Sequence, residues 1–132
     1  MPLAWDDSLK IGIPEIDHQH KLMIDQMNLL VDALKDNKAQ EEIQKIIHFL
    51  DGYVEQHFGF EEKCMHRYKC PIATTNDQAH RQFITSYNEI KAEFKAHGPS
   101  FMLVLQINQN LLDWFINHIR KIDTQLKPCM VP

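Results

Sequence analysis

A histidine and a glutamate occupy core positions in the middle of the chain. His57 and Glu61 are four residues apart, so on a helix they lie one above the other on the same face. The residues that precede them on that face, at steps of three and four, are all apolar: Ile43, Ile47, Leu50 and Val54. This periodicity marks the face as the buried one. An unpaired imidazole or carboxylate in a core costs on the order of several kcal/mol. The sequence therefore predicts that both groups bind something there.

Four long helices are expected to position this pair. Helical periodicity and end signals predict helices at about residues 14–35, 39–65, 74–97 and 100–119, followed by a short helical tail to about residue 127. The first thirteen residues are expected to form an extended arm, and Thr74 or Thr75 to cap the third helix. No strand pattern is present and the connections are short. The predicted fold is one all-α domain spanning residues 1–132, an antiparallel up-down-up-down four-helix bundle with an N-terminal arm and a short C-terminal helix.

Four histidines and the glutamate are predicted to lie at one depth of this bundle. Counted from turns near residues 37, 70 and 98, His20 and His57 lie about 17 and 20 residues from the first turn. Glu61 and His80 lie about 9 and 10 residues from the second, and His80 and His118 about 18 and 20 from the third. These mismatches amount to a few ångströms of helix rise. A single buried histidine is usually structural, but histidines and a carboxylate converging on one layer predict a metal site for iron, manganese or zinc.

Asp123 is a sixth candidate ligand. It follows His118 by five residues, which turns it about 140° away from that residue on a straight helix. Asp123 therefore reaches the layer only if the helix bends or restarts after His118, and the break in pattern at Arg120 and Lys121 permits this.

Composition and charge argue against several other classes of protein. The net charge is -4 and the basic residues are scattered, which argues against nucleic acid or a membrane surface as partner. No apolar run approaches the roughly 18 residues that span a bilayer, and the first ten residues lack the apolar core of a signal peptide. Cys64, Cys70 and Cys129 match neither a disulfide framework nor a CxxC metal pair. We expect three reduced thiols in a cytoplasmic protein.

The combined motifs resemble the hemerythrins, in particular the single-domain bacterial members. The matching motifs are Asp17-His18-Gln19-His20, His57-x3-Glu61, His80 and Trp114-Phe115-Ile116-Asn117-His118-x4-Asp123. The early Trp5 and the layout of helices agree with them, so the resemblance covers essentially the whole chain. The resemblance implies two iron ions (Fe2+/Fe3+) with an oxo or hydroxo bridge. It further implies that His20 and His57 hold the iron with an open position and that His80 and His118 hold the other. Glu61 and Asp123 would bridge the two.

The chain departs from the family pattern in its third and fourth helices. The family carries two histidines four residues apart in the third helix, whereas this chain has Asn76, followed by Asp77, and retains only His80. Water, the Asn76 amide oxygen or the Asp77 carboxylate are the alternatives for the missing imidazole. In the fourth helix Trp114 is expected on the inward stripe, and Phe115 stands where smaller aliphatic residues are common. The resemblance places Trp114 and Phe115 at the dioxygen pocket, which Phe115 would narrow.

The resemblance implies a protein that binds dioxygen reversibly for storage, delivery or sensing, rather than an enzyme. Nitric oxide and azide are expected as further exogenous ligands. One alternative is a di-iron oxidase, peroxidase or nitric-oxide-handling enzyme, because losing an imidazole at Asn76 leaves an additional exchangeable position. The other alternative is a scaffold that keeps the fold but binds one metal ion or none.

Overall fold

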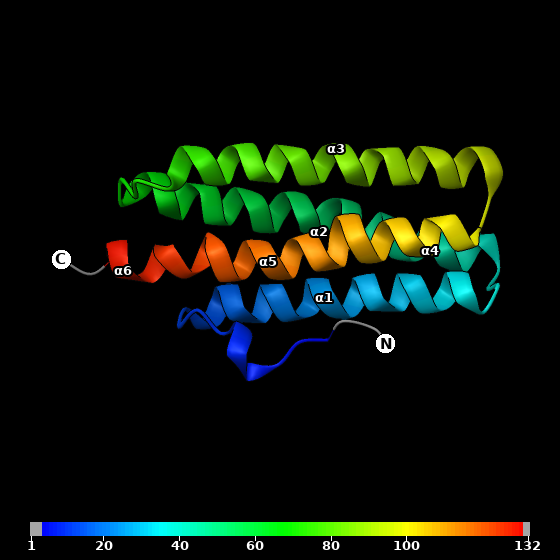
Figure 1. Cartoon of the computed structure of the whole chain (residues 1–132), viewed down its shortest axis with the longest axis horizontal. Helices are drawn as coiled ribbons and strands as arrows, with labels where there is room; N and C mark the ends of the chain where they lie inside the picture. The colour runs from blue at the N-terminus through cyan, green and yellow to red at the C-terminus, as the bar shows by residue number, and fades with distance from the viewer. Residues whose placement is uncertain (1–3, 131–132) are drawn as a thin grey trace.

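Four long helical segments lie side by side and form a helical bundle (Figure 1). A computed structural model describes residues 4–130 of the chain. The first three segments are α1 (Pro14–Lys35), α2 (Gln40–Arg67) and α3 (Ala73–His97). The fourth comprises α4 (Phe101–Ile107), the π-helix η2 (Asn108–Asp113) and α5 (Trp114–Lys121). Successive segments are joined at alternate ends of the molecule (Figure 1). The described residues contain no strand, and the prediction of an all-α bundle is confirmed.

Helix ends follow local signals in the sequence. Pro14 occupies the first turn of α1, where its missing N–H costs nothing. Gly98, with a φ of +74°, ends α3 in a conformation that favours glycine. The Ser100 side chain then caps α4 by accepting a hydrogen bond from the backbone N–H of Leu103 at 3.1 Å. The predicted threonine cap is wrong, because α3 begins at Ala73, ahead of both threonines.

The N-terminal arm is folded back against the bundle rather than fully extended. Its described part, from residue 4 onward, contains one 3-10 turn, η1 (Asp7–Leu9), and buries the side chains of Leu9 and Ile11. The Asp17 carboxylate holds it to the start of α1 by accepting hydrogen bonds from the backbone N–H groups of Ile11 (2.8 Å) and Gly12 (3.2 Å). The first three residues of the predicted arm lie outside the described residues.

The fourth segment contains a π-helix, η2, between its two α-helical parts. A π-helical turn takes in more residues than an α-helical turn, so the side chains that follow are rotated relative to a continuous α-helix. Phe115 is fully buried, whereas Trp114 is half-buried. Trp114, expected on the inward stripe, therefore lies at its edge, and Phe115 points into the bundle.

The structure also corrects the prediction of three reduced thiols. Cys70 and Cys129 form a disulfide with their Cα atoms 5.7 Å apart, while Cys64 is free. The two residues are separated by 59 positions in the sequence. They meet because the α2–α3 turn and the C-terminal helix α6 (Leu126–Met130) lie at the same end of the bundle (Figure 1). Sequence spacing alone does not reveal this proximity.

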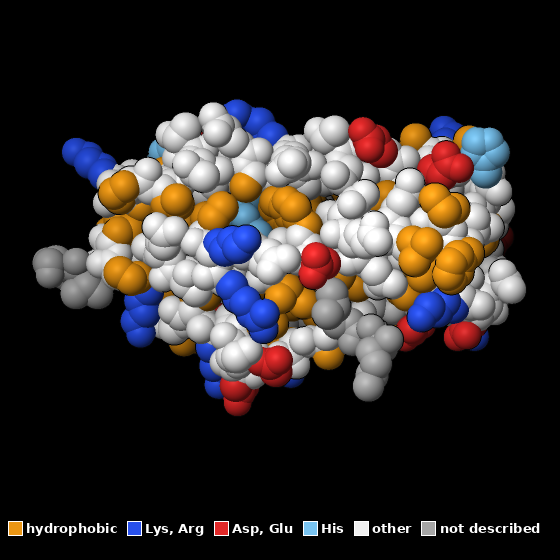
Figure 2. Space-filling model, viewed as in Figure 1, with side chains coloured by type: hydrophobic (Ala, Val, Ile, Leu, Met, Phe, Trp, Pro, Cys, Tyr) orange, Lys and Arg blue, Asp and Glu red, His pale blue; other side chains and the backbone are white. Residues whose placement is uncertain are grey.

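The visible surface is mixed in character. Figure 2 shows Lys, Arg, Asp and Glu side chains dispersed over one face, without a continuous basic patch. Hydrophobic side chains gather near the end where α4 begins (Figure 2), where Phe101 and Met102 are 73% and 61% exposed. Over the part of the chain that the structure describes, no helix combines the length and apolar composition needed to cross a membrane.

Candidate metal centre

The six residues that the sequence nominates as ligands come together in the interior of the bundle. Each long helical segment supplies at least one of them, and the short turn η3 (Asp123–Gln125) supplies the last. All are buried: His20 on α1, His57 and Glu61 on α2, His80 on α3, His118 on α5 and Asp123 on η3. These residues therefore lie at similar depths along the bundle, as the positions of the turns predict.

Glu61 lies between two pairs of histidines. Its Oε2 is 3.3 Å from Nε2 of His20 and 3.6 Å from Nε2 of His57. Its Oε1 is 3.1 Å from Nε2 of His80 and 3.9 Å from Nε2 of His118. The two oxygens of one carboxylate thus face different histidine pairs, as a bridging ligand would.

Asp123 closes the other side of the cluster. Its Oδ2 lies 3.1 Å from Nε2 of His20 and its Oδ1 lies 3.1 Å from Nε2 of His118. It reaches this position because α5 ends at Lys121 and the chain re-forms as the 3-10 turn η3. The restart that the sequence requires after His118 is present.

The donor set fits divalent or trivalent metal ions bound by nitrogen and oxygen. Two groups of potential ligands have all their donor atoms within 4.8 Å of one another, and they share Glu61: His20, His57 and Glu61 in one, and Glu61, His80, His118 and Asp123 in the other. Donors that are each about 2.1 Å from one ion stand roughly 3 Å apart when they bind at right angles. Nε2 of His57 is buried without a hydrogen-bond partner, as expected of an atom whose partner is an ion.

The pKa values in the cluster show which of its side chains carry protons when no metal is bound. Burial alone would lower the pKa of His20 and of His118, but the hydrogen bonds that these histidines donate to Asp123 and Glu61, and the negative charges of the two carboxylates, outweigh it and raise each pKa to about 9. Burial would raise the pKa of Glu61, but hydrogen bonds from the surrounding histidines hold that pKa well below its usual range. Burial lowers the pKa of His57 to about 3. Without metal, protons on His20 and His118 offset the charge of the buried carboxylates, and metal ions that bind these histidines must displace those protons.

The metal-free protein is expected to lose stability as the pH rises from 6.5 to 9. His20 and His118 have folded-state pKa values of about 9 against an ordinary value of 6.5. The free energy of folding that their protonated forms contribute is fully present below pH 6.5 and is lost as the pH passes through about 9. Thermal unfolding of chelator-treated protein should show Tm falling by about 5 °C or more across this window. The exposed control His48→Gln should keep the decline, and a flat or rising Tm would contradict the pairing.

Side chains outside the cluster hold two of the histidines in orientation. Nδ1 of His57 lies 2.6 Å from Oε1 of Gln19, which can only accept, so the proton is on Nδ1 and the Nε2 lone pair faces Glu61. Nδ1 of His80 is 3.3 Å from Oε2 of Glu62. Sequence reasoning did not identify Gln19, although its place next to His20 in the motif was a usable signal.

The position of the missing imidazole is occupied by a buried amide. Asn76 is fully buried one turn before His80, and neither its Oδ1 nor its Nδ2 has a hydrogen-bond partner. Asp77 points elsewhere: its Oδ2 is 2.7 Å from Nε2 of the exposed His66, and Asp77 belongs to neither group of potential ligands. The structure therefore places Asp77 in a hydrogen bond with a surface histidine and leaves Asn76 facing inward without a protein partner.

Aromatic rings pack against the histidines. The Phe115 ring stands edge-on to His20 and His57, with centroids 5.3 Å and 6.1 Å away. The Trp114 ring stacks on His118 at 4.7 Å. Phe115 thus covers the His20–His57 pair and Trp114 covers the opposite side of the cluster.

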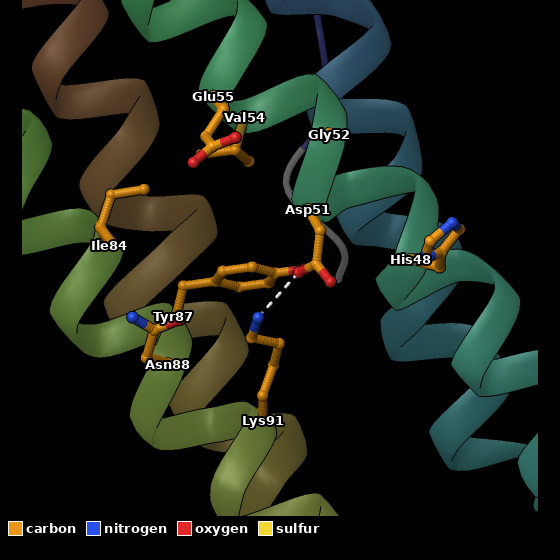
Figure 3. A pocket seen from close by; sticks show the side chains of 9 residues that line it. All are labelled: His48, Asp51, Gly52, Val54, Glu55, Ile84, Tyr87, Asn88 and Lys91. Atoms are coloured by element: carbon orange, nitrogen blue, oxygen red, sulfur yellow. Dashed lines mark hydrogen bonds and ion pairs between the residues drawn. The ribbon is translucent and has the colours of Figure 1, made fainter.

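A surface cavity between α2 and α3 is separate from the cluster. Its volume is about 510 Å³, and none of the six candidate ligands lines it. Figure 3 shows Tyr87 and Lys91 of α3 converging on Asp51 of α2. Lys91 Nζ donates to Oδ1 of Asp51 at 2.9 Å, and the Tyr87 hydroxyl lies 2.9 Å from the same oxygen. These groups form hydrogen bonds with one another, so their positions are explained without a ligand in the cavity.

Comparisons with known proteins agree over nearly the whole chain. A family model described as the hemerythrin HHE cation binding domain matches residues 11–130. The chain is 33% identical over 121 residues to a bacteriohemerythrin of Pseudomonas paraeruginosa, covering 92% of this chain and 76% of that protein. It is 29% identical over 118 residues to a bacteriohemerythrin of Methylococcus capsulatus, covering 86% and 85%. It is 26% identical over 126 residues to a hemerythrin-like protein of Naegleria gruberi, covering 96% and 92%.

Proposed function

The chain belongs to the hemerythrin family, and on that basis we propose that it is a non-haem di-iron protein that binds dioxygen reversibly, for storage, delivery or sensing. The observation that supports this most is the position of Glu61, whose two oxygens face two different histidine pairs. A single-metal site would not need a carboxylate placed in this way. We take the surrounding fold to be an antiparallel up-down-up-down bundle.

In this proposal each histidine pair holds one iron. His20 and His57 would hold one ion and His80 and His118 the other, with Glu61, which belongs to both groups of potential ligands, and Asp123 completing the set. When bound, two iron ions with an oxo or hydroxo bridge supply the electrons that dioxygen takes up. The donor atoms face inward from separate helical segments, so the bundle presets their positions before a metal binds.

The protein's own part is to orient the ligands and exclude water. Gln19 fixes the tautomer of His57, and the fully buried Phe115 covers His57 and His20 with an apolar ring. A dry, apolar surrounding slows the loss of a charged oxygen species because such a species is poorly solvated there.

Shortening Phe115 tests whether this ring bounds the dioxygen pocket. We expect Phe115→Leu to accelerate azide or dioxygen association several-fold, because the ring covers both histidines of the proposed open iron. The variant should also lose about 1–3 kcal/mol of stability. Stopped-flow absorbance measures the rate. Phe83→Leu is the matched control, since the Phe83 ring packs against Phe115 at 6.3 Å within the same core. Equal rates in both variants would contradict the assignment.

The proposed function is tested by metal analysis combined with optical spectroscopy. Freshly purified protein should contain about two irons per chain, and the reduced form should give a stable, reversible spectrum on exposure to air. Removal of dioxygen under argon should restore the original spectrum. Fewer than one metal per chain would overturn the proposal and support a scaffold.

Asn76 supports a second candidate, a di-iron oxidase, peroxidase or nitric-oxide-handling enzyme. Its unpartnered amide leaves the His80–His118 pair with one imidazole fewer than the family pattern. An exchangeable position there would admit nitric oxide, azide or a second substrate. Decay of the air-exposed spectrum coupled to substrate consumption would favour this enzyme over the dioxygen carrier.

A further inference from the structure

Asp123 is held differently from the other candidate ligands. The other five lie on the long helical segments, whereas Asp123 lies on the three-residue turn η3. Within the described residues, η3 and α6 make most of their backbone contacts with α5 and with each other. Leu126 is the fully buried apolar anchor of this C-terminal segment.

The Asp123 carboxylate lies close to a second buried carboxylate. Glu61 and Asp123 are two carboxylates in one buried cluster, and both touch Nε2 of His20 and of His118. Burying like charges close together is unfavourable unless cations lie between them. Asp123 is held in the cluster by its contacts with His20 and His118 and by the short turn η3, so freeing that turn weakens the hold on this ligand.

The disulfide opposes that movement. Cys129 follows Asp123 by six residues and bonds to Cys70 at the α2–α3 turn. Cys70 is a firm anchor, because its backbone N–H donates to the carbonyl of Met65 (2.9 Å) and its own carbonyl accepts from Ala73 (3.0 Å). The C-terminal segment is thus fixed at both ends, by α5 before Asp123 and by the disulfide after it.

We infer that Cys70 and Cys129 form a thiol–disulfide switch that controls how firmly Asp123 is held in the metal centre. The oxidised pair keeps Asp123 in place and retains the ions. The reduced pair frees the segment from residue 122 onward, and the ions leave faster. This inference rests on the proposed metal centre but not on dioxygen binding.

The exchange chemistry uses a dithiol as the two-electron reductant. Its thiolate attacks the sulfur of the half-buried Cys129, because Cys70 is 5% exposed. The Cys70–Cys129 bond breaks, and the Cys70 thiolate leaves and takes a proton. The second thiol of the reductant then displaces Cys129, so the reductant ends as a disulfide and the protein as two thiols. Hydrogen peroxide restores the bond by oxidising both thiols and yielding two waters.

Iron release under anaerobic conditions tests the switch. The protein is loaded with ferrous iron, so that a reductant cannot change the metal's oxidation state, and is treated or not with a phosphine reductant. Release to a ferrous chelator is followed by absorbance. We expect release to be at least tenfold faster after reduction. Thiol titration should find one free thiol before reduction and three after it.

Cysteine variants separate the switch from general effects of the reductant. Cys129→Ser and Cys70→Ser should release iron at the fast rate with and without reductant. Cys64→Ser, which removes the free thiol, should behave like the unmodified protein. Circular dichroism of the reduced unmodified protein should retain its helical signal, so that fast release does not reflect unfolding.

The outcomes distinguish the inference from the proposed function. Equal release rates for oxidised and reduced protein, or three free thiols after peroxide treatment, would overturn the switch and leave the metal centre standing. Oxidised protein that binds less than one iron per chain would overturn both. A fast rate in Cys64→Ser would also refute the assignment, because the effect would then not require the bonded pair.

Discussion

Glu61→Gln is expected to lower the metal content from about two ions per chain to fewer than one. Glu61 is the only residue shared by the two groups of potential ligands among the described residues. Glutamine keeps the shape but removes the negative charge, and its NH2 group cannot coordinate. One histidine pair would lose a donor, the other would keep only a neutral amide oxygen, and the negative charge of Glu61 between the two pairs would be lost. Metal analysis after gel filtration measures the content directly.

The neighbouring helix surface provides a matched control for Glu61→Gln. Glu55 lies on the same helix, is exposed, and lies outside both ligand groups. Glu55→Gln makes the same chemical change and should leave the metal content unchanged. If Glu61→Gln retained two ions with unaltered optical bands, Glu61 would not be the bridge. Helical circular dichroism should accompany the measurement, because Glu61 also pairs with His20 and His80 in the metal-free cluster.

Helical periodicity and turn positions predicted most of the arrangement around this glutamate. Apolar stripes and proline or glycine stops located the long helical segments to within a few residues. Counting from the turns then put His20, His57, Glu61, His80 and His118 at one depth, and their side chains do converge. This works because helix rise is constant, so residue number converts directly to distance along a straight bundle.

The parts that sequence reasoning missed depend on departures from regular helices or on contacts between distant segments. Trp114 lies at the edge of the core rather than inside it, and no residue within the π-helix η2 marks an extra-wide turn. The disulfide joins residues 59 positions apart whose proximity requires the docked C-terminal segment. Gln19 matters through a hydrogen bond across two helices. Each of these is a property of the packed tertiary structure.

Asn76 is where the chain's own chemistry is expected to differ from that of its relatives. It lies fully buried one turn before His80, and neither polar atom of its amide has a hydrogen-bond partner in the protein. Burying an amide in this way is costly, so we expect an ion or a water molecule to bind it. An amide oxygen is a neutral and weaker donor than imidazole. The iron on the His80–His118 side would therefore be held by fewer strong donors than the family pattern implies.

Asn76→His is expected to slow autoxidation of the dioxygen complex by about tenfold, which corresponds to about 1.4 kcal/mol in the barrier. The new imidazole would fill the exchangeable position, so azide and nitric oxide would bind more weakly and iron would be retained longer. Decay of the optical spectrum in air and azide titration measure the two effects. Asn88→His, at an exposed position on the same helix α3 (Figure 3), makes the identical change away from the cluster. An unchanged autoxidation rate in Asn76→His, or an equal slowing in Asn88→His, would mean that the amide at position 76 does not set the reactivity of this centre.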